Sequence, residues 1–151
     1  MEKRTDADKI NVVSLFSRAG GLDLGLTQTG RYEVLLANEI LLKPVQTYSS
    51  NFNVKILELS PKLEDLPGIS YGDVERLDFS GVGDAEAGLL VGGPPCQDFS
   101  IVRGPSFERR GINVQRGRLY THFIRALARF HPNVFIMENM PGLKSANKGS
   151  A

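Results

Sequence analysis

Residues 11–30, NVVSLFSRAGGLDLGLTQTG, decide the fold of this chain. The first six form a short apolar, β-branched run, which predicts a strand over 11–16. A turn from Ser17 to Gly21 follows, and the apolar spacing after it predicts a short helix that ends at Gly30. A strand that leads through glycines into a helix is typical of the first unit of an α/β fold.

The same alternation continues along the chain. Further helices are expected over 44–53 and 118–130, whereas 54–68, with two prolines, is expected to be an irregular connection. About five mostly parallel strands, flanked by helices on both faces of the sheet, are therefore predicted. After the first strand, the others are expected over 33–38, near 69–72, over 88–92 and over 133–137.

Composition limits the class of protein. The chain has 151 residues, of which 41% are hydrophobic and 23% charged, as in a soluble single-domain protein. No apolar run approaches the roughly 18 residues of a membrane span, and the polar lead-in over residues 1–10 does not resemble a secretory signal. We therefore expect a cytoplasmic protein. A single cysteine excludes an intrachain disulfide and a cysteine-based zinc site, and no metal is expected.

Charge is distributed unevenly. Residues 1–100 hold 9 basic and 15 acidic side chains, whereas residues 101–151 hold 9 basic and 2 acidic ones. Arginine clusters suit phosphate backbones, because the guanidinium presents a fork of donors to anionic oxygens. A solvated loop is the alternative explanation. The clustered arginines are Arg103, Arg109, Arg110, Arg116 and Arg118.

Each predicted strand ends in a polar or unusual segment. Because ligands bind outside the carboxyl ends of strands in open parallel sheets, these segments are expected to line one rim. They are Ser17–Gly21, Asn38–Glu39, Gly72–Asp73, Gly92–Cys96 and Glu138–Asn139.

Three of these segments suit a nucleotide-like ligand. Gly20 and Gly21 would let the backbone approach a ligand closely at a helix N-terminus. Glu39 follows Gly21 by 18 residues, near the spacing of about 20 at which an acid binds ribose hydroxyls in this fold. Asp73 could accept a hydrogen bond from an adenine amino group. A solvated loop acid for Glu39 and a turn aspartate for Asp73 are the alternatives.

The strongest local signal is GGPPCQDFS, residues 92–100. Two prolines fix φ and remove backbone donors, so the cysteine after them is held rigidly. A rigid thiolate suits attack on a carbon atom at a set distance. A buried, inert cysteine is the alternative, and a Pro-Pro loop makes it a poor one.

Taken together, these stretches resemble the cytosine-5 DNA methyltransferase family. The chain departs from the family pattern at Arg18, where motif I usually carries glycine. The large cation could crowd the pocket or point to solvent. The matching stretches are FSRAGG at 16–21 (motif I), NE at 38–39 (II), GDV at 72–74 (III), PPCQDFS at 94–100 (IV), RGRL at 116–119 (V) and ENM at 138–140 (VI).

The resemblance implies a Rossmann-like S-adenosylmethionine-dependent methyltransferase fold and a role for each matching residue. Cys96 and Glu138 would be catalytic: the Cys96 thiolate would add to carbon 6 of cytosine and Glu138 would hold ring nitrogen 3. Asn139 would support the Cys96 loop. DNA contacts would come from Gln97, Ser100 and Arg103. The cofactor-binding residues would be Phe16, Ser17, Ala19, Gly20, Gly21, Glu39, Ile40, Asp73, Val74, Pro95 and Leu119.

Residues 11–151 would then be a partial catalytic domain, since the target-recognition region and the C-terminal motifs do not follow motif VI.

Several interpretations remain open. The chain is a catalytic half completed by a second polypeptide, or a truncated or non-catalytic fragment that binds cofactor or partner. The same chemistry could act on transfer RNA, although DNA is favoured. A nucleotide-binding module with an idle cysteine is the fourth alternative.

Overall fold

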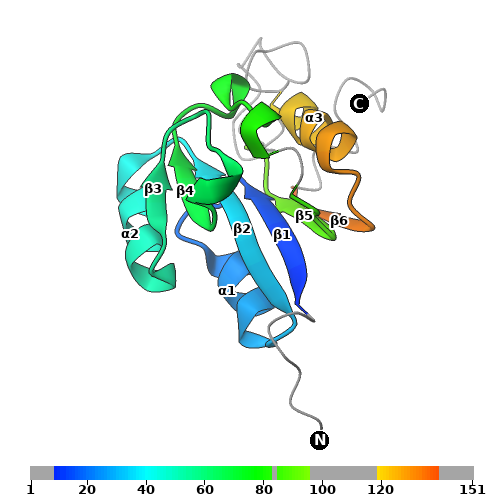
Figure 1. Ribbon diagram of the computed structural model, residues 1–151. Helices are drawn as coiled ribbons and strands as arrows, with labels where there is room; N and C mark the ends of the chain where they lie inside the picture. The colour runs from blue at the N-terminus through cyan, green and yellow to red at the C-terminus, as the bar shows by residue number, and fades with distance from the viewer. Residues whose placement is uncertain (1–8, 83–84, 96–118, 140–151) are drawn as a thin grey trace, which may run out of the picture.

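The computed structural model describes residues 9–82, 85–95 and 119–139, which form an α/β sandwich around one parallel sheet (Figure 1). Within these residues the sheet has six strands in the order β3-β4-β2-β1-β5-β6, and every pair of neighbours is parallel. The predicted α/β class is confirmed. The strands are β1 (Ile10–Leu15), β2 (Tyr32–Glu39), β3 (Lys55–Leu57), β4 (Gly68–Tyr71), β5 (Leu89–Gly92) and β6 (Val134–Met137).

One strand more is present than the sequence predicted. β3 lies within 54–68, which was expected to be an irregular connection, and it pairs with β4 through only three residues. So short a strand is defined by its neighbour rather than by its own pattern, because three residues cannot display an alternation. The other five strands lie where they were predicted, within two residues at either end.

Helices cover both faces of the sheet. One face carries α1 (Gly21–Gln28) and α2 (Leu42–Phe52), and the other carries α3 (Tyr120–Phe130) and short 3₁₀ turns that include Val74–Arg76 and Ser80–Val82. The strand β1 shows why both faces are needed, because Val12 packs toward α1 whereas Val13 and Leu15 pack toward α3. None of the helices in these segments is long and apolar enough to cross a membrane.

The register of the strands brings their carboxyl ends to one rim. Leu15 pairs with both Asn38 and Gly92, and Gly92 pairs with Met137. The residues that follow β1, β2, β4, β5 and β6 therefore emerge side by side, as the rim prediction required.

The β6 edge of the sheet is apolar and exposed. Val134, Phe135 and Ile136 are 58%, 55% and 42% exposed, although the Phe135 ring still meets Phe123 of α3 edge-on at 6.2 Å.

Candidate functional site

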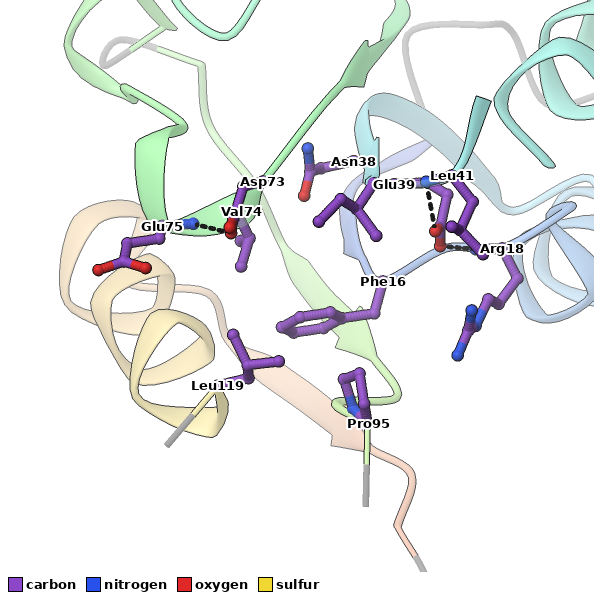
Figure 2. A pocket seen from close by; sticks show the side chains of 11 residues that line it. Phe16, Arg18, Asn38, Glu39, Leu41, Asp73, Val74, Glu75, Pro95 and Leu119 are labelled. Carbon is purple, nitrogen blue, oxygen red and sulfur yellow. Dashed lines mark hydrogen bonds between the residues drawn. The ribbon is translucent and has the colours of Figure 1, made fainter. Parts of the chain in front are cut away.

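A pocket of about 500 Å³ opens at the carboxyl ends of the strands (Figure 2). Its size lies within the range of small-molecule and cofactor sites, and its wall combines apolar side chains with three carboxylates. The lining residues are Phe16, Arg18, Asn38, Glu39, Ile40, Leu41, Asp73, Val74, Glu75, Pro95 and Leu119.

Glu39 is the buried acid of this pocket. Its side chain is only 3% exposed, yet no cation is paired with it among the described residues. Instead, Oε2 accepts the backbone N–H of Arg18 at 3.0 Å and Oε1 accepts that of Leu41 at 2.9 Å. Each carboxylate oxygen keeps a second lone pair, so the fixed acid can accept two further donors, such as the paired hydroxyls of a ribose.

Asn38, the residue before Glu39, ties the strand ends together. Its Nδ2 donates to the carbonyls of Ser70 at 3.1 Å and Gly72 at 3.2 Å, and its own carbonyl accepts the N–H of Ser17 at 3.0 Å. The N–H of Gly72 in turn donates to the Glu39 carbonyl at 3.0 Å. The segments after β1, β2 and β4 are thus held in one arrangement around the pocket.

The glycine turn is shaped by aromatic residues of α2. Gly20 has φ +88°, and a Cβ built there would overlap the Phe52 ring and lie 2.8 Å from Cδ2 of Tyr48. Around Gly21, by contrast, no atom lies within 4 Å of the Cβ position. The missing side chain at Gly20 therefore makes room for the α2 rings, while the close approach of the Gly20–Gly21 backbone to a ligand stays a prediction.

Beneath this turn lies a buried polar network. Asp23 is 1% exposed and accepts the hydroxyls of Ser14 on Oδ1 and of Tyr48 on Oδ2, both at 2.8 Å. Burial raises the pKa of the Asp23 carboxyl above its ordinary value, although the two hydroxyl donors oppose that shift. Burial, together with the neighbouring Asp23, also raises the pKa of Tyr48. The network fixes the Tyr48 ring against Gly20.

The opposite wall comes from the turn after β4. Asp73 precedes the 3₁₀ turn Val74–Arg76, and its Oδ1 accepts the N–H of Glu75 at 2.9 Å. That bond is the turn-capping arrangement considered as the alternative for Asp73. Asp73 nevertheless lines the pocket with Val74, so capping does not remove it from the site. Figure 2 shows the Phe16 ring projecting into the pocket toward Leu119.

Arg18 points away from the acid that its backbone holds. Its φ is +54°, a conformation that glycine adopts more easily than arginine, and this turns its N–H toward Glu39. The side chain is exposed and extends away from the Glu39 carboxylate (Figure 2). It borders the pocket rather than filling it.

The ends of β5 and β6 also meet. The N–H of Glu138 donates to the carbonyl of Gly92 at 2.9 Å, and a Cβ on Gly93 would lie 3.2 Å from Oε2 of Glu138. The exposed Glu138 carboxylate thus lies against the loop that leads to Cys96, while Pro95 of the same loop lines the pocket. Cys96, Gln97, Ser100 and Arg103 lie outside the described residues.

Comparison with known proteins agrees with this arrangement. The family model of C-5 cytosine-specific DNA methylases matches residues 10–151. The chain belongs to this family. The DNA (cytosine-5-)-methyltransferase M.ApeKI of Aeropyrum pernix is 55% identical over 147 residues, which are 95% of this chain and 31% of that protein. The type II methyltransferase M.NgoFVII of Neisseria gonorrhoeae is 33% identical, over 97% of this chain and 34% of its own length.

A solved structure supports the fold. The Dnmt2 methyltransferase of S. pombe superposes with a TM-score of 0.61 at 16% sequence identity, over 93% of this chain and 39% of that one. This chain spans about a third of the length of the curated relatives it matches.

The pocket brings together most of the residues predicted to bind cofactor. Ser17, Ala19, Gly20 and Gly21 belong to the adjoining turn and are not among the lining residues. Those that do line it are Phe16, Glu39, Ile40, Asp73, Val74, Pro95 and Leu119.

Sequence reasoning missed three lining residues, Asn38, Leu41 and Glu75, and gave Arg18 no binding role. Asn38 carried a usable signal, because the Asn38–Glu39 segment lies at the end of a predicted strand and was expected on the rim. Leu41 and Glu75 had no such signal, since each simply follows a predicted site residue.

Proposed function

We propose that this chain holds S-adenosylmethionine and the nucleophile Cys96 in a DNA methyltransferase that transfers a methyl group to carbon 5 of cytosine. The observation that carries the proposal is the meeting of two sites on one rim. The Glu39 pocket and the Glu138 carboxylate flank the loop of Gly93 and Pro95 that leads to Cys96.

The pocket residues fit the cofactor, which supplies an electron-poor methyl group on a sulfonium sulfur. Glu39 would accept the ribose hydroxyls with the lone pairs that Arg18 and Leu41 leave available. Phe16 and Ile40 would pack on the purine. The remaining predicted contacts are the Ser17–Gly21 backbone around the methionine portion, Asp73 and Val74 at the adenine edge, and Pro95 and Leu119 in the wall.

The chemistry follows from the thiolate and the carboxyl. The Cys96 sulfur forms a bond to carbon 6 of cytosine, and Glu138 holds a proton at ring nitrogen 3 so that the ring accepts the electron pair. Carbon 5 would then attack the methyl carbon, and the carbon–sulfur bond of the sulfonium would break, with its electron pair leaving on S-adenosylhomocysteine. A base removes the carbon-5 proton, the double bond re-forms and the thiolate leaves. Asn139 would support the loop.

The DNA substrate requires more protein than these residues. A cytosine inside a duplex is unreachable, so it is flipped out of the stack, and Gln97, Ser100 and Arg103 would contact the DNA around it. We propose that sequence reading comes from the part of the relatives' length that this chain does not span, supplied by a second chain. The enzyme would act in the cytosol, where the DNA lies.

The test is covalent trapping on DNA that contains 5-fluorocytosine, in which carbon 5 carries no removable proton. The 151-residue chain is combined with the part of the Aeropyrum pernix relative that lies beyond the matched region, and S-adenosylmethionine is added. We expect an adduct that survives denaturing electrophoresis with the wild-type chain and none with Cys96→Ser.

Three results would each contradict a part of the proposal. Cofactor binding without an adduct would indicate the non-catalytic subunit, and an adduct on transfer RNA but not on DNA would change the substrate. An adduct formed by the chain alone would refute the need for a second polypeptide.

A further inference from the structure

Arg125 of α3 reaches across to the 3₁₀ turn that forms one wall of the pocket. Its Nη2 donates to the carbonyls of Val74 at 2.6 Å and Leu77 at 2.9 Å, and its Nη1 donates to that of Glu75 at 3.3 Å. The guanidinium also lies over the Phe79 ring, 5.1 Å from its centroid. One side chain therefore holds three carbonyls of a single short segment.

The chemistry of the turn explains why an arginine suits this place. The last carbonyls of a helical turn carry partial negative charge, and the Val74 carbonyl, which already accepts the N–H of Leu77 at 3.2 Å, has a second lone pair for the guanidinium. A guanidinium offers several N–H donors fixed in one plane, whereas an ammonium is a compact point charge with three rotatable donors. The fork therefore fixes the orientation of the turn as well as its distance from α3.

The other end of the same segment is held by β2. Gly72 accepts from Nδ2 of Asn38 at 3.2 Å and donates to the Glu39 carbonyl at 3.0 Å. Asp73, Val74 and Glu75, which line the pocket, thus stand between two anchors. Arg125 is not among the lining residues, so it would act on a ligand indirectly, through the segment whose carbonyls it holds.

We propose that Arg125 is a positioning residue for adenine recognition: by holding the Val74 and Leu77 carbonyls it sets where the Asp73–Val74 segment meets the purine edge. The inference rests on the proposed function, because that function places adenine against this wall. A displacement of a few tenths of an ångström there weakens a hydrogen bond to a base while leaving the ribose contact at Glu39 in place. Arg125 thus governs base selectivity more than affinity for the ribose.

The experiment compares two ligands on the chain completed as described above. Calorimetry measures the Kd of S-adenosylhomocysteine and of its inosine analogue, in which a carbonyl replaces the adenine amino group. The variants are Arg125→Met, which keeps the apolar stem over Phe79, and Arg125→Lys. Arg129→Ala, one turn along the same helix and outside the pocket lining, is the matched control.

We expect Arg125→Met to bind the adenine ligand about tenfold more weakly and the inosine ligand nearly as the wild type does, so that the preference between them shrinks. The ratio of the two Kd values for Arg125→Lys should lie between the ratios for the wild type and for Arg125→Met. The ratio for Arg129→Ala should match that of the wild type. Melting temperatures identify the range in which every variant is folded, and each Kd is measured within it.

A merely structural role would lower the melting temperature of Arg125→Met and leave the ratio of the two Kd values unchanged. That result, or equal weakening of both ligands, would overturn the inference alone. Failure of the wild type to bind S-adenosylhomocysteine would overturn the proposed function and the inference with it.

Discussion

Replacing Gly20 by alanine tests the packing of the glycine turn most directly. The residue has φ +88°, which costs a non-glycine residue about 1–2 kcal/mol. The new Cβ would also overlap the Phe52 ring and lie 2.8 Å from Cδ2 of Tyr48, and overpacking of this kind costs about 1–3 kcal/mol. We expect the free energy of unfolding to fall by about 2–5 kcal/mol, a large share of the roughly 5–15 kcal/mol of a typical domain.

Gly21→Ala is the matched control, because no atom lies within 4 Å of its Cβ position and the residue begins α1. Alanine there should leave the stability unchanged or raise it by up to about 1 kcal/mol. Urea unfolding followed by circular dichroism gives the midpoint of each variant of the 151-residue chain. Equal midpoints for the two variants would refute the reasoning, since the argument requires Gly20 alone to be enclosed.

Three further changes probe the acids. Glu39→Gln places an amide N–H₂ opposite the N–H of Arg18 or Leu41. Calorimetry of the completed chain should therefore show that S-adenosylhomocysteine binds about tenfold more weakly or worse. An unchanged Kd would show that Glu39 does not contact the ligand. Tyr48→Phe leaves Oδ2 of Asp23 without its hydroxyl donor, so urea unfolding should show a loss of about 1–3 kcal/mol, and no loss would contradict the network. Burial raises the pKa of the Asp23 carboxyl in the folded protein above its ordinary 3.8. Between these two pKa values the folded state therefore binds more protons at Asp23 than the unfolded state does. Its unfolding free energy relative to Asp23→Asn should therefore be highest below pH 3.8 and fall as pH rises through the raised pKa, whereas a difference that is constant with pH would refute the shift.

The order of strands and helices could be predicted from the sequence alone, because periodicity and glycine turns are local properties. Five of the strands in the described residues were predicted in this way, and their carboxyl ends placed Glu39, Asp73 and Glu138 on one rim. β3 could not be found, since a three-residue strand exists only through its pairing with β4.

Only the tertiary structure decided which partners the polar groups have. In the sequence Asp23 is an ordinary acid in the first turn of a helix, but in the fold it lies under the glycine turn and accepts hydrogen bonds from Ser14 and Tyr48. The sequence gives no reason to expect more than a solvated helix residue at Arg125, but in the fold its guanidinium donates to the Val74 and Leu77 carbonyls beside the pocket. The physical reason is the same in both cases: a hydrogen bond depends on where two distant segments meet, and no local pattern records that distance.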